Sequence, residues 1–226
     1  MIKDNLLKIK EEIEKAKMHS ITKEDVKLVA VSKTRTIEEI KEAIECGQVD
    51  FGENRVQELR EKINNINYKI NYHMIGNLQT NKVKYIYDKV YLIHSLDNLS
   101  LAREINKRAV NDNLIVNCLV QVNIGNEPQK GGVSYCDTER FIEDVLGFTN
   151  IKINGLMTIA PQTDDEKYLR ECFRKMFILK NKIQDRNYEN LNMKYLSMGM
   201  SSDFKIAIEE GANIVRIGTN IFGKRN

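Results

Sequence analysis

The sequence contains no tryptophan and only two prolines among its 226 residues, and it has no linker rich in glycine or serine. Nothing therefore marks a domain boundary, and we expect a single domain over residues 1–226. Long apolar runs are also missing, which excludes a membrane-spanning helix. The first 17 residues alternate charged and apolar positions and have no secretory apolar core. We expect an amphipathic helix there and a cytoplasmic protein.

Paired cysteines are absent as well. The four cysteines, at positions 46, 118, 136 and 172, form no C-x-x-C pair, so we expect neither a metal site nor a disulfide framework. The 35 basic and 32 acidic residues nearly cancel, leaving a net charge of +3. This balance gives no general reason to expect a nucleic-acid or membrane partner. An RNA-binding surface remains a weak alternative, carried by Lys82, Lys84, Arg103 and Lys107, but such helical lysines usually form a solvated face.

What the sequence does contain is a regular alternation of short β-rich runs with segments of helical period. Eight strands are predicted, at Lys27–Val31, Val49–Phe51, Tyr72–Ile75, Val90–His94, Ile115–Val122, Ile153–Thr158, Tyr195–Met198 and Ile214–Ile217. Helices are predicted between them, at Ile37–Cys46, Val56–Asn64, Thr80–Tyr87, Asn98–Val110, Thr138–Leu146, Glu166–Asp185 and Asp203–Glu210. The pattern predicts a single (β/α)8 barrel of the TIM type with an extra N-terminal helix. An open, doubly wound sheet is the alternative.

Active sites of such barrels lie at the carboxyl ends of the strands. Lys33 follows the apolar run at 28–31 and would project from a strand end into the barrel mouth. Desolvation there lowers the pKa of an ammonium group, and a neutral amine attacks aldehydes. Lys33 is therefore a candidate Schiff-base residue for a carbonyl cofactor. Taken alone, the residue is better interpreted as a strand-end lysine that reaches water.

Two glycine-containing segments, SMGMSSD (197–203) and VRIGTN (215–220), follow the last two predicted strands. The loops after these strands often bind phosphate in this fold, with Ser201 and Thr219 as donors. Ordinary turns, with Ser202 or Asp203 capping a helix, are the alternative. Arg216 lies within the last strand, where its charge is costly unless paired or hydrogen-bonded. It would face either the nitrogen of a bound ring or a carboxylate on a neighbouring strand.

These residues belong to longer segments that resemble one known family. The segments are VAVSKT (29–34), FGENRVQE (51–58), HMIGNLQTNK (73–82), GLMTIAP (155–161) and SMGMSSDFKIAIEEGANIVRIGTNIFGKR (197–225). They resemble the pyridoxal phosphate homeostasis protein family, whose barrel is similar to the N-terminal domain of alanine racemase. One departure is Arg55, where the family usually has tyrosine, and it puts in doubt an aromatic contact at that position.

The resemblance implies a barrel of fold type III that holds pyridoxal 5'-phosphate as a Schiff base on Lys33. It implies that Arg216 faces the ring nitrogen, and that Ser201, Gly218 and Thr219 hold the phosphate. Asn54 and Met200 are carried over as further cofactor-binding residues. The motif from His73 to Lys82 has no assigned role, and a structural role is favoured for His73.

The same resemblance implies vitamin B6 homeostasis, by buffering or delivery of the cofactor, without robust catalysis and with no catalytic residues. Transient contact with apo-enzymes that use this cofactor is then expected, and so is a monomer. The alternative is a weak amino-acid racemase, which needs a second base opposite Lys33. Tyr72, Tyr135 and Tyr195 are the candidates. An alanine racemase takes its opposing tyrosine from a second domain, for which the 226 residues leave no room.

Overall fold

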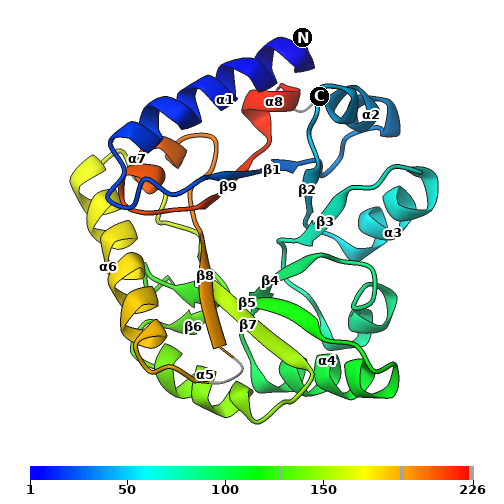
Figure 1. The fold of residues 1–226 in the computed structure, drawn as a ribbon, viewed down its shortest axis with the longest axis vertical. Helices are drawn as coiled ribbons and strands as arrows, with labels where there is room; N and C mark the ends of the chain where they lie inside the picture. The colour runs from blue at the N-terminus through cyan, green and yellow to red at the C-terminus, as the bar shows by residue number, and fades with distance from the viewer. Residues whose placement is uncertain (128, 189–190, 224–226) are drawn as a thin grey trace.

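A closed ring of parallel strands forms the centre of the computed structural model, which describes residues 1–127, 129–188 and 191–223 (Figure 1). The strands of the ring are β1 (Lys27–Val31), β2 (Asp50–Glu53), β3 (Asn71–Met74), β4 (Leu92–Leu96), β5 (Val116–Asn123), β7 (Ile151–Thr158), β8 (Leu191–Ser197) and β9 (Ile214–Ile217). They are ordered β4-β3-β2-β1-β9-β8-β7-β5, and a pairing of β4 with β5 closes the ring. The predicted barrel is confirmed, and the open-sheet alternative is wrong.

Helices surround this ring on the outside (Figure 1). They are α1 (Ile2–Met18), α2 (Ile37–Glu45), α3 (Val56–Asn65), the 3-10 helix η1 (Thr80–Tyr85), α4 (Leu99–Asn111), α5 (Thr138–Leu146), α6 (Glu166–Gln184), α7 (Phe204–Glu209) and α8 (Thr219–Phe222). Among the described residues, the sequence missed only short elements, namely α8 and the two-residue strand β6 (Val133–Ser134) beside β5.

Local sequence signals explain where several helices begin and end. In the capping box of α2, Thr36 Oγ1 accepts from the Glu39 amide at 3.2 Å and Glu39 Oε2 accepts from the Thr36 amide at 2.8 Å. The segment predicted as a helix from Thr80 to Tyr87 is instead a 3-10 helix that ends at Tyr85. Its β-branched and aromatic side chains disfavour a continuous α-helix, and short i→i+3 bonds replace it.

The N-terminal helix α1 packs against α2, α7 and α8 (Figure 1). Its buried side chains recur at helical spacing and are Ile2, Leu6, Ile9, Ile13 and Ala16. The Asn5 side chain donates to the Ile221 carbonyl at 2.9 Å, which ties α1 to α8. The extra helix therefore covers the side of the barrel where the first and last strands meet.

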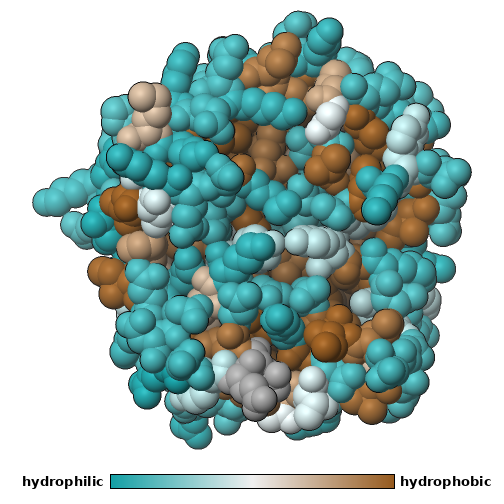
Figure 2. Space-filling model, in the orientation of Figure 1, coloured by the Kyte–Doolittle hydropathy of each residue, from teal (hydrophilic) through white to brown (hydrophobic). Residues whose placement is uncertain are grey.

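The surface is polar over most of the face seen in Figure 2, and the hydrophobic side chains there lie in separate groups. The exposed large apolar residues are correspondingly scattered along the sequence, from Met1 to Met200. Within the described ranges, no helix combines the length and the hydropathy that crossing a membrane requires.

The strand β7 depends on one glycine. Gly155 has a φ of +142°, a value that side chains rarely adopt, and lies where the register of β7 against β8 shifts. A Cβ atom at this position would lie 1.8 Å from the carbonyl oxygen of Tyr195. The close approach of these two backbones therefore requires glycine.

We predict that Gly155→Ala lowers the free energy of unfolding by about 3 kcal/mol or more, because a strained φ and a backbone clash combine. Urea denaturation followed by circular dichroism measures this value. Gly147→Ala is the matched control, since its φ is −67° and the nearest atom would lie 3.6 Å away. It should change stability by less than about 1 kcal/mol. Equal effects of the two substitutions would contradict the prediction.

Candidate functional site

A cavity of about 490 Å³ opens at the carboxyl ends of β1, β8 and β9. Three segments distant in sequence line it, with the residues Val31, Lys33, Arg35, Met200, Ser201, Ser202, Arg216, Gly218, Thr219 and Asn220. The barrel brings these segments together because β1 pairs with β9 and β9 pairs with β8. The cavity therefore lies where the fold class predicts an active site.

Lys33 lies in a tight turn directly after β1 and is half-buried. The Arg35 amide donates to the Ser32 carbonyl at 3.0 Å and closes this turn. Thr34 has a φ of +63°, which is unusual for a β-branched residue, and its amide donates to Glu58 Oε2 at 2.8 Å. The turn is thus held in a strained conformation that directs Lys33 to the cavity wall.

A buried ion pair between Lys62 and Glu53 holds the start of this turn. Lys62 Nζ donates to the Ser32 carbonyl and to Glu53 Oε1, both at 2.6 Å, and Ser32 Oγ donates to the same carboxylate oxygen at 2.6 Å. The two charged side chains are almost completely buried, Glu53 at 0% exposed and Lys62 at 4%. Burial raises the pKa of Glu53, while Lys62 and Ser32 act in the opposite direction. The residue before Lys33 is therefore anchored to β2 and α3.

The two glycine-containing loops expose backbone donors. The amides of Ser201, Ser202, Thr219 and Asn220 donate to no other group in the described part of the chain. The Asn220 side chain donates to the Ser201 carbonyl at 3.0 Å and joins the two loops. Asp203 is the N-cap residue of α7, but its side chain makes no capping hydrogen bond to the helix, because its Oδ1 accepts from the Met200 amide at 2.6 Å. Residues 201–203 form a turn, as the alternative supposed, and its unpaired N–H groups also suit an anion.

Arg216 is 4% exposed and reaches the cavity from within β9. Its Nη1 donates to Ser197 Oγ at 2.6 Å and its Nη2 donates to the Thr158 carbonyl at 2.8 Å. Burial lowers the pKa of Arg216 to about 10, and the charge of Asp203 acts in the opposite direction. Among the described residues, no carboxylate lies within ion-pair distance of this guanidinium. The salt-bridge interpretation of Arg216 is therefore not supported.

The electrostatic character of the cavity follows from this composition. Its wall contains three cationic side chains, those of Lys33, Arg35 and Arg216, and no carboxylate among the residues described. Arg35 is held by Glu39 at 3.2 Å and by the Gly223 carbonyl at 2.5 Å. A small anion beside an amine is the ligand that this wall fits best.

Most of the predicted cofactor-binding residues lie together in this wall, namely Lys33, Met200, Ser201, Arg216, Gly218 and Thr219. Asn54 follows β2 and is not among the residues that line the cavity, so its role stays a prediction. The sequence analysis placed Ser202 and Asn220 in the two glycine-containing segments without a cofactor-binding role, and it did not single out Arg35. Arg35 stands two positions after Lys33, and that proximity was the only available signal.

The candidate second bases lie elsewhere. Tyr195 donates to or accepts from Tyr91 at 3.1 Å, at the opposite end of the barrel. Tyr72 is buried within β3, where burial and Glu53 raise its pKa to about 12. Tyr135 is partly buried against the hydrophobic core. No tyrosine occurs among the described residues that line the cavity with Lys33.

Comparison with known proteins identifies the family. The family model described as "Alanine racemase, N-terminal domain" matches residues 5–226. A pyridoxal phosphate homeostasis protein of Aquifex aeolicus is 46% identical over 224 residues, which cover 98% of this chain and 97% of the relative. The chain belongs to the pyridoxal phosphate homeostasis protein family. The resemblance inferred from the sequence segments is confirmed.

Solved structures agree with this family assignment. PipY of Synechococcus elongatus PCC7942, solved with PLP bound, has a TM-score of 0.87 and 30% sequence identity. The match covers 99% of this chain and 100% of PipY. An alanine racemase of Clostridium difficile 630 has a TM-score of 0.78 with 16% identity, and the match covers 98% of this chain and 57% of the racemase. At 16% identity the comparison with the racemase shows a shared fold only. PipY is more similar to this chain in both sequence and structure.

We predict that Lys62→Met lowers the free energy of unfolding by about 3–5 kcal/mol, because it leaves the Glu53 carboxylate buried without its partner. Adding Glu53→Gln should restore more than half of this loss, since the uncompensated charge disappears. Urea denaturation of the two single variants and the double variant gives the coupling energy. A double variant whose loss equals the sum of the single losses would contradict the account of the ion pair.

Proposed function

We propose that this chain binds pyridoxal 5'-phosphate covalently through Lys33 and serves in the buffering or delivery of that cofactor. The single observation that carries the proposal is the cavity wall, in which an amine stands among cationic groups and unpaired backbone amides. Pyridoxal phosphate supplies an aldehyde, which condenses with a primary amine with loss of water. The Lys33 side chain offers that amine at the cavity.

The phosphate would be held by the loops after β8 and β9. The Ser201, Ser202, Thr219 and Asn220 amides are the available donors, and the Ser201 and Thr219 hydroxyls add to them. Arg216 would face the pyridine nitrogen. A guanidinium retains its protons and would keep that nitrogen unprotonated, so the ring would be a weak electron sink. This arrangement favours binding over carbanion chemistry.

A non-catalytic role is the second part of the proposal. Racemisation needs a proton donor and acceptor on opposite faces of the cofactor, within hydrogen-bond reach. Lys33 can serve one face, and the described lining offers no tyrosine for the other. The names of the relatives, which refer to homeostasis, agree with this role. We further propose that the protein acts as a cytoplasmic monomer that contacts apo-enzymes only transiently.

We predict that borohydride reduction of the protein incubated with pyridoxal phosphate leaves one phosphopyridoxyl group on Lys33, mapped by peptide mass spectrometry. Lys33→Ala should abolish the adduct, because no other amine lies in the described cavity wall. Lys194→Ala is the control, since this lysine lies at the other end of the barrel, and it should label as the parent does. A full adduct on another lysine in Lys33→Ala would relocate the site.

We predict that the loaded protein exchanges the α-proton of L- or D-alanine in deuterated water no faster than pyridoxal phosphate alone does. NMR or mass spectrometry of the amino acid measures this exchange. Incorporation of deuterium at an enzymatic rate, abolished in Lys33→Ala, would overturn the non-catalytic role. Activation of an apo-enzyme by the loaded protein would support delivery.

A further inference from the structure

A continuous chain of hydrogen bonds crosses the interior of the barrel behind Arg216. Arg216 Nη1 lies 2.6 Å from Ser197 Oγ, which lies 3.0 Å from Nδ1 of His94. Nε2 of His94 lies 2.9 Å from Nδ1 of His73, and Nε2 of His73 lies 2.9 Å from Asp50 Oδ1. The five residues come from five strands, β9, β8, β4, β3 and β2, and Asp50 is the first residue of β2. None of the cofactor-binding roles assigned above uses the last four residues.

The direction of each bond in this hydrogen-bond chain follows from the protonation states that the surroundings favour. Hydrogen bonds from His73 and Lys27 outweigh the effect of burial and lower the pKa of Asp50, so its carboxylate is ionised and only accepts. Burial lowers the pKa of His73, against the opposite effect of Asp50, and it also lowers the pKa of His94, which favours neutral rings with one proton each. His73 must then donate through Nε2 and accept at Nδ1.

The same constraint passes along the chain. His94 donates through Nε2 to His73 and accepts at Nδ1, which receives the Ser197 hydroxyl proton. Ser197 in turn accepts from Arg216, which can only donate. All four bonds therefore point from the guanidinium at one end to the carboxylate at the other, and neighbouring bonds of this kind strengthen one another.

The side chains of this hydrogen-bond chain are costly to bury. Its three central side chains, those of His73, His94 and Ser197, are all 0% exposed, in an interior that such barrels usually fill with branched apolar side chains. Replacing buried polar groups with apolar ones of similar volume is often neutral or stabilising, so stability alone does not explain them. A role in holding Arg216 does explain them, because Ser197 and Thr158 are its two fixed acceptors.

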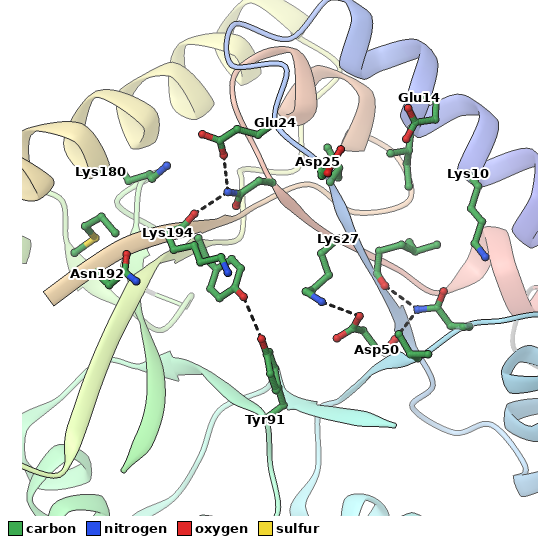
Figure 3. A pocket seen from close by; sticks show the side chains of 18 of the residues that line it. Lys10, Glu14, Glu24, Asp25, Lys27, Asp50, Tyr91, Lys180, Asn192 and Lys194 are labelled. Atoms are coloured by element: carbon green, nitrogen blue, oxygen red, sulfur yellow. Dashed lines mark hydrogen bonds and ion pairs between the residues drawn. The ribbon is translucent and has the colours of Figure 1, made fainter. Parts of the chain in front are cut away.

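The two ends of the chain open into different cavities. Arg216 lines the cavity with Lys33, whereas Asp50 lines a cavity of about 1010 Å³ at the amino ends of the strands. Figure 3 shows Lys27 reaching Asp50 in this amino-end cavity, with Tyr91 below them in the view. The Lys27 ammonium lies 2.9 Å from Asp50 Oδ2, and the Tyr91 ring packs on His73 with a centroid distance of 5.3 Å. The carboxylate end, at 5% exposure of Asp50, thus lies in the wall of this cavity.

We propose that Ser197, His94, His73 and Asp50 are positioning residues that hold Arg216 toward the ligand. Through them, the Asp50 carboxylate in the cavity at the amino ends of the strands is coupled to cofactor binding in the cavity at the carboxyl ends. The proposal rests on the function proposed above for Lys33 and Arg216. A change in the charge of Asp50 alters the order of the chain and therefore the hydrogen bonds that Arg216 makes. The two cavities are in this way thermodynamically linked.

Histidine NMR tests the chain without any substitution. The sequence has three histidines, and His19 is exposed at the end of α1, outside the chain. In protein labelled with ¹⁵N-histidine, His73 and His94 should both show the Nε2–H tautomer of a neutral ring. Loading with pyridoxal phosphate should shift the His94 and His73 signals and leave His19 unchanged. Unchanged His73 and His94 signals, in protein whose Lys33 carries the reduced adduct in a parallel sample, would overturn the proposal.

Substitutions test the linkage. Ser197→Ala should weaken cofactor binding by about tenfold, since it removes an acceptor of a charged donor. Asp50→Asn keeps the shape and removes the charge, and we expect roughly threefold weaker binding together with a shift of the His73 signal. Glu210→Gln is the matched control, because it removes a buried carboxylate that pairs with Arg170 and Arg174 and takes no part in the hydrogen-bond chain.

The outcomes separate the two proposals. If the parent protein gains no adduct on Lys33, the proposed function fails. If the adduct forms and Asp50→Asn binds the cofactor as Glu210→Gln does, the function stands and the coupling is wrong. If Asp50→Asn weakens binding and shifts the His73 signal, while Glu210→Gln does neither, the coupling is supported.

Discussion

The guanidinium of Arg216 is buried in the barrel, and among the described residues no carboxylate lies within ion-pair distance of it. Much of the interior is arranged around that fact. A charge removed from water must be compensated by hydrogen bonds or by an opposite charge. Ser197 and the Thr158 carbonyl supply the hydrogen bonds, and burial still lowers the pKa of Arg216. The charge of Asp203 acts against this lowering, and in the proposed complex the pyridine nitrogen would lie opposite the guanidinium on the cavity side.

The barrel topology makes this compensation possible. Pairing of β1 with β9, and of β9 with β8, places the turn that carries Lys33 beside both glycine-containing loops. Parallel strands present their carboxyl ends on the same rim, so an amine, a guanidinium and unpaired amides from distant segments converge there. The buried pair of Glu53 and Lys62 then anchors the first of these segments to its neighbours.

Prediction from the sequence succeeded where the signal was local. The strands Lys27–Val31 and Ile214–Ile217 and the helix Thr138–Leu146 have the predicted bounds, because short apolar runs and a clear helical period define them. The segment after Thr80 was assigned the wrong helix type, since its propensities are weak and backbone bonding decides between the two forms. His73 was expected to be structural, but the sequence did not indicate the buried hydrogen bonds that join it to Asp50 and His94.

The sequence by itself determined the barrel, the family and the candidate Lys33, because periodicity, glycine positions and contiguous motifs are written along the chain. Only the tertiary structure decided what surrounds Arg216, which tyrosines lie away from the cavity, and that two histidines meet in the interior. These facts depend on contacts between strands far apart in the chain. A hydrogen bond between positions 73 and 94, or 94 and 197, leaves no periodic trace, since it arises from closure of the ring and not from any local preference.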